Sequence, residues 1–278
     1  MGNDARVSAP VDGALQPLAP GTLMRLACGS LAVDVAPAAG GRVAQIAYAG
    51  NEWLVGHDGH AAMIAWGSYP MLPWAGRIRR GRFAFEGRRY ELPLNLGDHA
   101  IHGVGFALPW RIDAQSAQSV ALSLQLPEDT RWPFGGSATQ RIEVHERALR
   151  MDLAVTAGAQ AMPIAIGWHP WFRKPDRIEF GPRAQYPRDG EGIAVRPLVQ
   201  PTAGPWDDCF LNDGPVVLQR ADQRLRLTSD CSRWVIYDEL AHATCVEPQT
   251  GPPDAFNLEP VRIVPGEVMR ARFLLEWL

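Results

Sequence analysis

The sequence contains a single lysine, Lys174, in 278 residues. Schiff-base aldolases and pyridoxal enzymes act through a lysine, so each of these chemistries would depend on that one position. The arginines are scattered along the chain and the formal net charge is −3, which gives no general attraction to phosphate backbones or to anionic lipid. These features argue against lysine-based catalysis and against nucleic acid as a partner.

Cysteines and long apolar runs are equally sparse. The four cysteines form no C-x-x-C unit and are too few for a disulfide framework in a chain of this length, so we expect reduced, buried thiols. No stretch approaches the roughly 20 apolar residues of a membrane span. The start of the chain also lacks a basic region followed by an apolar one. The sequence therefore predicts a cytoplasmic protein without a membrane partner.

Motifs for metals, nucleotides and activated serines are missing as well. The pairs His57-x-x-His60 and His99-x-x-His102 have a spacing that zinc sites use, but neither has the H-E-x-x-H context and no cysteine pair accompanies them. The G-x-S-x-G motif of serine hydrolases and the G-x-G-x-x-G motif of dinucleotide-binding folds are absent. We therefore predict no metal and no cofactor.

What the sequence does contain is a series of short segments in which polar and apolar residues alternate. This period of two is typical of half-buried strands, and it occurs over residues 30–35, 119–126, 141–145, 149–155, 224–228 and 269–275. Glu86-Gly87 lies between two further short segments and predicts a tight hairpin. Without long amphipathic helices, these strands favour stacked antiparallel sheets. We predict an all-β protein with little helix: one large antiparallel β-sandwich over residues 25–278, after a loosely held arm over residues 1–24.

Two segments far apart in the sequence carry groups that could exchange protons with a substrate. Glu247 lies in a proline-rich segment near the end of the chain, and His169 lies between two tryptophans in the middle. A carboxylate can accept a proton at neutral pH, and a protonated imidazole can donate one. The opening of a sugar ring needs both steps at once.

Several separated blocks resemble the aldose 1-epimerases, the galactose mutarotase family. They occur in the family's order over residues 73–83, 94–95, 100–103, 167–172, 206–210 and 245–257, within a resemblance that runs from about residue 25 to the C-terminus. The last block is the most specific. The resemblance implies a galactose mutarotase-like supersandwich, an antiparallel β-sandwich that binds sugar in a cleft on a concave face, and this agrees with the strand pattern.

The resemblance also implies roles for individual residues. Glu247 matches the general base that deprotonates the anomeric hydroxyl, and with an ordinary pKa of about 4.3 it would be ionised at neutral pH. His169 matches the general acid that protonates the ring oxygen, and a neighbouring carboxylate would favour its imidazolium form. His102, Arg77 and Asp207 match positions that hold the sugar. No cofactor is implied.

Other positions are candidates or departures from the family pattern. Asp208, next to Asp207, is the other residue that could face the sugar, and Gly76 stands where family members commonly have asparagine. Aromatic rings pack well against the C–H face of sugars. The tryptophans and phenylalanine adjacent to matched blocks are therefore candidate platforms: Trp74, Trp168 and Phe210.

The preferred hypothesis is an aldose 1-epimerase that acts on a free aldose, and three alternatives stay open. The arginines from Arg77 to Arg82 could bind a hexose 6-phosphate at the rim of the cleft. Glu247 and Asp207 could form the carboxylate pair of a glycoside hydrolase. The same fold could also serve as a carbohydrate-binding protein without turnover.

Overall fold

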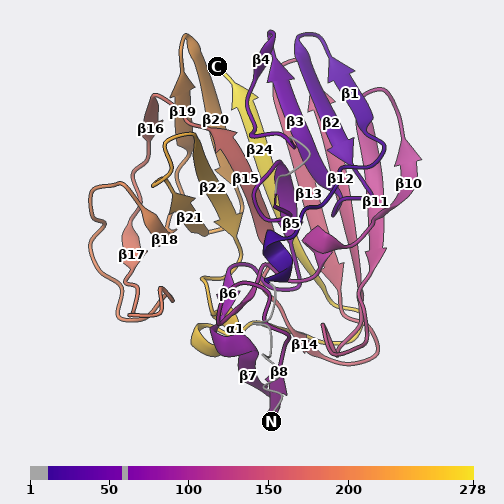
Figure 1. The fold of residues 1–278 in the computed structure, drawn as a ribbon, viewed down its shortest axis with the longest axis vertical. Coiled ribbons are helices and arrows are strands. Elements are labelled where there is room, and N and C mark those ends of the chain that lie inside the picture. Colours follow the sequence, from indigo (N-terminus) through magenta and orange to yellow (C-terminus); the bar gives the residue numbers. More distant parts are fainter. Residues whose placement is uncertain (1–11, 58–61) are drawn as a thin grey trace, which may run out of the picture.

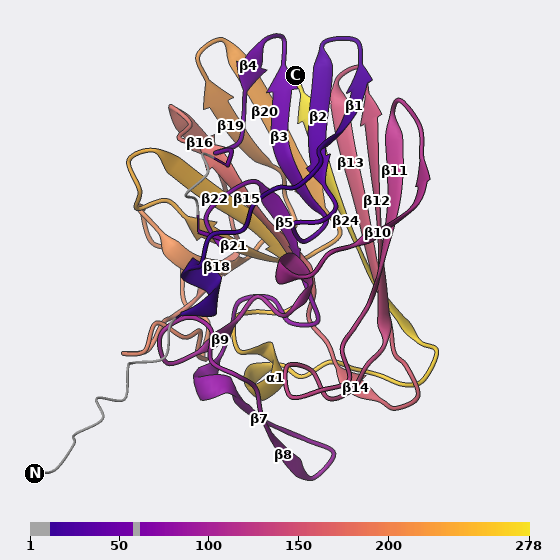
Figure 2. The same ribbon diagram turned by 45° about the vertical axis from the view of Figure 1, so that its right-hand side comes forward.

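Two large antiparallel sheets form the body of the protein and face each other (Figures 1 and 2). The computed structural model describes residues 12–57 and 62–278. Within them, the first sheet has 10 strands. Their order is β1 (Met24–Cys28), β2 (Leu31–Ala36), β3 (Arg42–Tyr48), β5 (Ser68–Met71), β15 (Gly167–Arg173), β22 (Ala243–Gln249), β21 (Arg233–Tyr237), β18 (Asp207–Leu211) and β17 (Ala184–Tyr186), with β4 (Asn51–Glu52) paired to β3.

The second sheet contains most of the strands that the alternating pattern predicts. Its eight strands run in the order β10 (Arg111–Gln115), β11 (Ser119–Gln125), β12 (Ser137–His145), β13 (Ala148–Thr156), β24 (Val268–Trp277), β20 (Gln223–Ser229), β19 (Val216–Arg220) and β16 (Arg177–Glu179). In β12, β13 and β24 buried residues alternate with more exposed ones along the whole strand. The predicted segments are confirmed here and, for residues 30–35, in β2 of the first sheet, and the β-sandwich is confirmed with them.

Shorter elements connect the sheets and border one end of the first sheet. The paired strands are β6 (Arg77–Ile78) with β9 (Ala100–Ile101), β7 (Arg82–Phe85) with β8 (Arg88–Glu91), and β14 (Met162–Pro163) with β23 (Arg262–Ile263). In the described residues the helices are η1 (Gly13–Leu15), η2 (Arg79–Gly81), η3 (Gly105–Ala107) and α1 (Ala255–Leu258). The predicted hairpin is confirmed as β7–β8, which projects from the body in Figure 2.

The hydrophobic core lies between the two sheets. Trp168 of β15 is fully buried there, packs against Phe273 of β24 at 5.9 Å between ring centroids, and donates its indole N–H to Gln140 Oε1 of β12 at 2.9 Å. Gln140 in turn donates to the carbonyl of Gly41 at 2.7 Å. These contacts join the sheets and leave both polar groups of the Gln140 side chain satisfied, as burial requires.

The predicted loose arm differs from the structure over the residues that can be described. Residues 1–11 lie outside the described part of the chain. From residue 12 onward the chain is held in place: Ala14 is 1% exposed and donates its N–H to the carbonyl of Asn95 at 3.0 Å, and Ile64 donates to the carbonyl of Ala14 at 3.1 Å. Main-chain hydrogen bonds therefore fix this segment although its sequence has no strand periodicity.

No helix within residues 12–57 and 62–278 has the length and apolar character needed to span a bilayer.

Candidate active site

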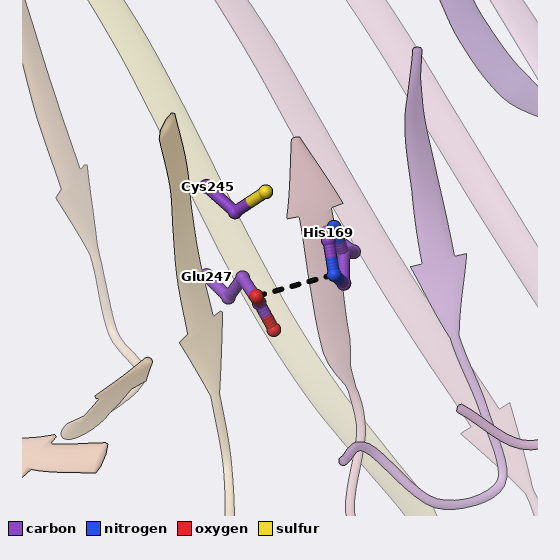
Figure 3. Close-up of side chains that lie close together, drawn as sticks. All are labelled: His169, Cys245 and Glu247. Carbon is purple, nitrogen blue, oxygen red and sulfur yellow. Dashed lines mark ion pairs between the residues drawn. The ribbon is translucent and has the colours of Figure 1, made fainter. Parts of the chain in front are cut away.

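Two neighbouring strands of the first sheet bring His169 and Glu247 together (Figure 3). The register of β15 and β22 pairs Gly167 with Gln249 and Trp171 with Cys245, so it sets His169 opposite Glu247. Because side chains alternate between the faces of a strand, both point away from the hydrophobic core. His169 Nε2 lies 3.2 Å from Glu247 Oε1, and neither side chain is more than 7% exposed. The sequence-predicted acid and base thus meet across one strand pair.

A cleft of about 310 Å³ opens over this pair on the outer face of the first sheet. Strands β15, β18, β21 and β22 of the first sheet line it, together with loops and short elements at the end of the sheet. The predicted residues among them are Arg77, His102, His169, Asp207 and Glu247, with Asp208 beside them. The structure therefore gathers both candidate catalytic residues and all three candidate sugar-binding residues in one cleft.

Burial and hydrogen bonding act in opposite directions on Glu247. Its Oε2 accepts a hydrogen bond from Gln249 Nε2 at 3.0 Å, which favours the carboxylate. Burial in the floor of the cleft and the nearby charge of Asp207 favour the protonated acid, and burial is the larger effect. The pKa of Glu247 is therefore raised well above its ordinary value, which differs from the ordinary carboxylate that the sequence suggested.

His169 lies in a stack of aromatic side chains. Its ring is stacked on Tyr69 at 4.9 Å and on Trp171 at 5.3 Å between centroids. Burial, with smaller contributions from the positive charges of Arg42 and Arg77, lowers the pKa of His169 to about 3. A carboxylate lies beside His169 as expected, yet burial opposes the imidazolium form that this neighbour would favour.

A buried arginine extends the stack behind Tyr69. The guanidinium carbon of Arg42 lies 5.0 Å from the centroid of the Tyr69 ring and 4.2 Å from that of Trp66. Burial lowers the pKa of Arg42 to about 9. In the described part of the chain its N–H groups meet no carboxylate; they donate to the carbonyls of Ala39, Met63, Trp66 and Phe106. Arg42 thus fixes the backbone around Tyr69 and places a positive charge behind His169.

A strained turn brings His102 to the cleft. His102 has a φ of 59°, and Gly103 follows with a φ of 74°. A Cβ atom on Gly103 would lie 1.9 Å from the carbonyl oxygen of Leu72, so only glycine fits there. The ring of His102 meets that of His169 edge to face at 4.9 Å. Burial and the charges of His169 and Arg77 lower the pKa of His102 well below its ordinary value, which keeps the ring neutral.

Asp207 and Asp208 share one cation at the side of the cleft. Arg188 binds Asp207 through Nη1 at 2.5 Å and Asp208 through Nε at 3.3 Å. Asp207 of β18 lies opposite Tyr237 of β21, and Tyr237 lies opposite Cys245 of β22. Residues that lie opposite one another share a face of the sheet, and Cys245 shares its face with Glu247 two residues on. Asp207 therefore lies on the same face as Glu247. Asp207 is also the aspartate whose charge acts on Glu247. This register favours Asp207 over Asp208 as the residue facing the floor of the cleft.

Arg77 differs from the other arginines of its segment. Arg79 pairs with Asp189 at 2.5 Å, and Arg80 pairs with Glu191 at 2.8 Å. Arg82 pairs with Glu91 of the projecting hairpin at 3.2 Å. Arg77 has neither a side-chain hydrogen bond nor an ion pair within the described residues, and it lines the cleft. Its guanidinium therefore keeps donors available for a ligand.

The predicted aromatic platforms are not in the cleft. Trp168 and Phe210 are fully buried in the core, because each directly precedes or follows a cleft-facing residue on its strand and must point to the other side. Trp74 is 3% exposed and lines a separate cavity. The aromatic side chains that do line the cleft are Trp171 and Tyr237.

Sequence reasoning missed several cleft residues for which a signal existed. Trp171 lies two residues after His169, and Gln249 two residues after Glu247, so the period of two places each on the face of its neighbour. Cys245, two residues before Glu247, lies on the same face by the same rule, although it is fully buried and does not line the cleft. Arg188 had no such signal, since it lies in a loop between β17 and β18.

The described residues contain one group that could ligate a metal ion. His169, Cys245 and Glu247 each offer one ligand atom, and these atoms lie within 4.8 Å of one another. The histidine pairs of the sequence give no comparable group: His99 accepts a hydrogen bond from the main-chain N–H of Arg80 at 3.1 Å, and His60 lies outside the described residues.

Comparison with known proteins places this cleft in a family. The model of the family described as aldose 1-epimerase matches residues 29–276. The chain belongs to the aldose 1-epimerase family. Among relatives, the uncharacterized protein YphB of Escherichia coli (strain K12) is 31% identical over 107 residues, which cover 37% of this chain and 36% of that protein.

Solved structures share the fold of this family member at low sequence identity. A galactose mutarotase-like protein from Clostridium acetobutylicum has a TM-score of 0.82 at 16% identity, with 92% of this chain and 95% of that chain covered. Galactose 1-epimerase from Lactobacillus acidophilus has a TM-score of 0.77, also at 16% identity, with 92% and 94% covered. The predicted galactose mutarotase-like fold is confirmed by these likenesses.

Proposed function

We propose that this member of the aldose 1-epimerase family interconverts the α and β anomers of a free aldose. The observation that carries the proposal is the contact of 3.2 Å between His169 Nε2 and Glu247 Oε1 on the floor of a cleft. An acid and a base so close together can act on two neighbouring oxygens of one small molecule.

The proposed reaction opens the ring and closes it again. Glu247 takes the proton of the anomeric hydroxyl while His169 protonates the ring oxygen, so the bond between C1 and that oxygen breaks without leaving an alkoxide. Rotation about the bond between C1 and C2 presents the other face of the new carbonyl. Glu247 and His169 then act in the reverse sense and close the opposite anomer. His102, Arg77 and Asp207 hold the hydroxyls during these steps.

The opposite pKa shifts of the two groups fit a pair that holds one proton between them. Burial disfavours a charge on either side chain, so both groups are pushed toward their neutral forms, with the proton on Glu247. Transfer of this proton to His169 produces the carboxylate and the imidazolium that ring opening needs. The titration then belongs to the pair rather than to either residue.

The charges of the cleft favour an uncharged sugar over a hexose 6-phosphate. Even with the proton on Glu247, carboxylates outnumber arginines in the lining, which contains Asp207, Asp208 and Glu239 against Arg77 and Arg188. Arg188 is neutralised by its two aspartates. The arginines that follow Arg77 are also paired with acids, so no cationic cluster remains for a phosphate group in this part of the chain.

Polarimetry tests the proposal directly. The optical rotation of freshly dissolved α-D-glucose and α-D-galactose is followed with and without the protein, and with the Glu247→Gln variant as control. We expect faster decay of the rotation with the wild-type protein and the spontaneous rate with the variant. No acceleration for either sugar, while hexose 6-phosphates are accelerated, would contradict the proposed substrate; binding without acceleration of any sugar would contradict the proposed activity.

A further inference from the structure

Cys245 stands beside the proposed acid and base although the proposed reaction does not use it. Figure 3 shows the side chains of Cys245 and Glu247 leaving β22 on the same side, toward His169 of β15. All three side chains are buried, and one potential ligand atom of each lies within 4.8 Å of the other two. A thiol, an imidazole and a carboxylate are the three kinds of side chain that bind zinc in proteins.

The spacing of these atoms comes close to that of a tetrahedral metal site. Bonds of about 2.0–2.2 Å to nitrogen and oxygen, at the tetrahedral angle, separate the two ligand atoms by about 3.4 Å. The distance between His169 Nε2 and Glu247 Oε1 is 3.2 Å. A sulfur bond of about 2.3 Å would put the thiolate about 3.6 Å from the nitrogen. The separations in the structure do not exceed 4.8 Å, so Cys245 Sγ would need to approach the nitrogen by about 1.2 Å at most.

We propose that His169, Cys245 and Glu247 form a binding site for a thiophilic divalent cation such as Zn²⁺ or Cd²⁺, and that occupation of this site blocks the cleft. The cation replaces the proton of the thiol and the proton that Glu247 and His169 share, both of which are released to solvent, and no electron transfer takes place. Three protein ligands leave a fourth position, as in zinc sites that bind a water molecule or a substrate. This position faces the cleft, because His169 and Glu247 line it.

The cleft offers the cation a route to the site. Cys245 is fully buried, whereas His169 and Glu247 line the cavity that opens to solvent. The same two side chains would contact the sugar in the proposed reaction, so a bound cation and a sugar exclude each other. Inhibition of turnover by the cation rests on the proposed function, but binding of the cation does not.

The donor set also predicts which cations bind. Thiolate and imidazole ligands suit Zn²⁺ and Cd²⁺, whereas Mg²⁺ and Ca²⁺ prefer sites made of oxygen atoms. We therefore expect Mg²⁺ and Ca²⁺ at the same concentration to leave the cleft free. This selectivity distinguishes a built site from general attraction of cations to the carboxylates of the lining.

Direct binding is measured by titrating the reduced protein with CdCl₂ and following the ultraviolet charge-transfer absorption of the cadmium–thiolate bond. The variant Cys245→Ser removes the sulfur ligand. The matched control is Cys209→Ser, since Cys209 is also buried and lines the same cleft but does not belong to the group of three. Cys28→Ser controls for the partly exposed thiol at the edge of the first sheet.

We expect the wild-type protein and both control variants to bind one equivalent of Cd²⁺ with the charge-transfer band, and Cys245→Ser to lose the band. The affinity should fall at least about tenfold, since loss of a second-shell partner already costs tenfold or more. An equal band in Cys245→Ser, a band lost in Cys209→Ser instead, or no band in the wild-type protein would each overturn the proposal.

Two further measurements separate this site from the proposed activity. Whichever sugar the wild-type protein turns over should weaken Cd²⁺ binding in proportion to the sugar concentration. Cd²⁺ should inhibit turnover by the wild-type protein at a lower concentration than it inhibits turnover by the Cys245→Ser variant. A chelator should restore activity. If no sugar is turned over, the band and its loss in Cys245→Ser still decide the metal site; if Cys245→Ser does not fold, competition by the sugar in the wild-type protein decides it.

Discussion

The two faces of the first sheet bury polar side chains in opposite ways, as two glutamines show. Gln140 of the second sheet reaches the core face and uses both ends of its amide, donating to the carbonyl of Gly41 and accepting from Trp168. Gln249, on the cleft face, is also fully buried and donates to Glu247, but its Oε1 meets no partner in the described part of the chain.

The difference between the two glutamines means that the unpartnered oxygen of Gln249 lowers the stability of the folded state. A buried polar atom without a partner destabilises the folded state by about 1–3 kcal/mol. The Nδ1 atoms of His102 and His169 are in the same position as Gln249 Oε1, with no partner on another described residue. Unpartnered polar atoms are not confined to the cleft face, since the indole N–H of Trp277 in the core also meets no partner among the described residues, so the contrast applies to the two glutamines themselves.

The variant Glu247→Gln should distinguish the role of the cleft face from that of the core face most clearly. We expect nearly all catalysed mutarotation to disappear, because the variant has no proton acceptor, while the folded state becomes more stable at neutral pH. Burial raises the folded-state pKa of Glu247, so the unfolded chain releases its proton first and this residue costs stability as the pH rises above the ordinary range of glutamate. Polarimetry and thermal unfolding measure the two effects.

The melting temperature gained by Glu247→Gln over the wild-type protein should shrink as the pH falls toward about 4, because Glu247 of the unfolded wild-type chain is then protonated too. A variant that is both inactive and less stable at pH 7 would mean that Glu247 serves the fold.

Trp168→Ala tests the other face. We expect a loss of about 3–5 kcal/mol in the free energy of unfolding, since the change empties a fully buried site and leaves Gln140 without one partner. Trp168→Phe should cost much less and keep full activity. Urea unfolding and polarimetry distinguish these outcomes. A folded Trp168→Phe protein without activity would mean that packing on the core face also controls the reaction.

His169→Asn should reduce kcat/KM by about two orders of magnitude or more, the range for loss of a general acid. Its effect on the free energy of unfolding should be small beside that of Trp168→Ala, although the two residues are adjacent on β15. Polarimetry of the folded variant measures the activity. Activity equal to that of the wild-type protein would remove His169 from the mechanism.

The smallest expected effect is a shift in the pH dependence. Activity needs one proton on the pair formed by Glu247 and His169. Because burial lowers the pKa of His169 to about 3 and raises that of Glu247 well above its ordinary value, kcat/KM should be high from about pH 4 upward and decline only as the pH passes the raised pKa of Glu247. After subtraction of the uncatalysed rate, an acid-side decline centred at about pH 4.3 together with an alkaline decline at about pH 6.5 would mean that both groups titrate with ordinary pKa values.

Sequence reasoning was most accurate where local rules decide the outcome. The strands with a period of two and the hairpin at Glu86-Gly87 were predicted because alternation and turn chemistry act over a few residues. It was wrong about Trp168 and Phe210, although alternation along β15 and β18 would have assigned both to the core. That prediction relied on the position of each residue next to a matched block, whereas the direction of the side chain decides which face of the sheet it occupies.

The sequence by itself determined the sandwich, the family and the residues that could exchange protons, because strand period and motif order depend only on short segments of the chain and their order. Only the tertiary structure decided the charge state of the site. The register of β15 and β22 set His169 against Glu247. Segments outside the sheets came together and paired the arginines that follow Arg77 with acids. Burial of His169 and Glu247 then shifted both pKa values. Burial and pairing depend on neighbours from the whole chain, which no local pattern specifies.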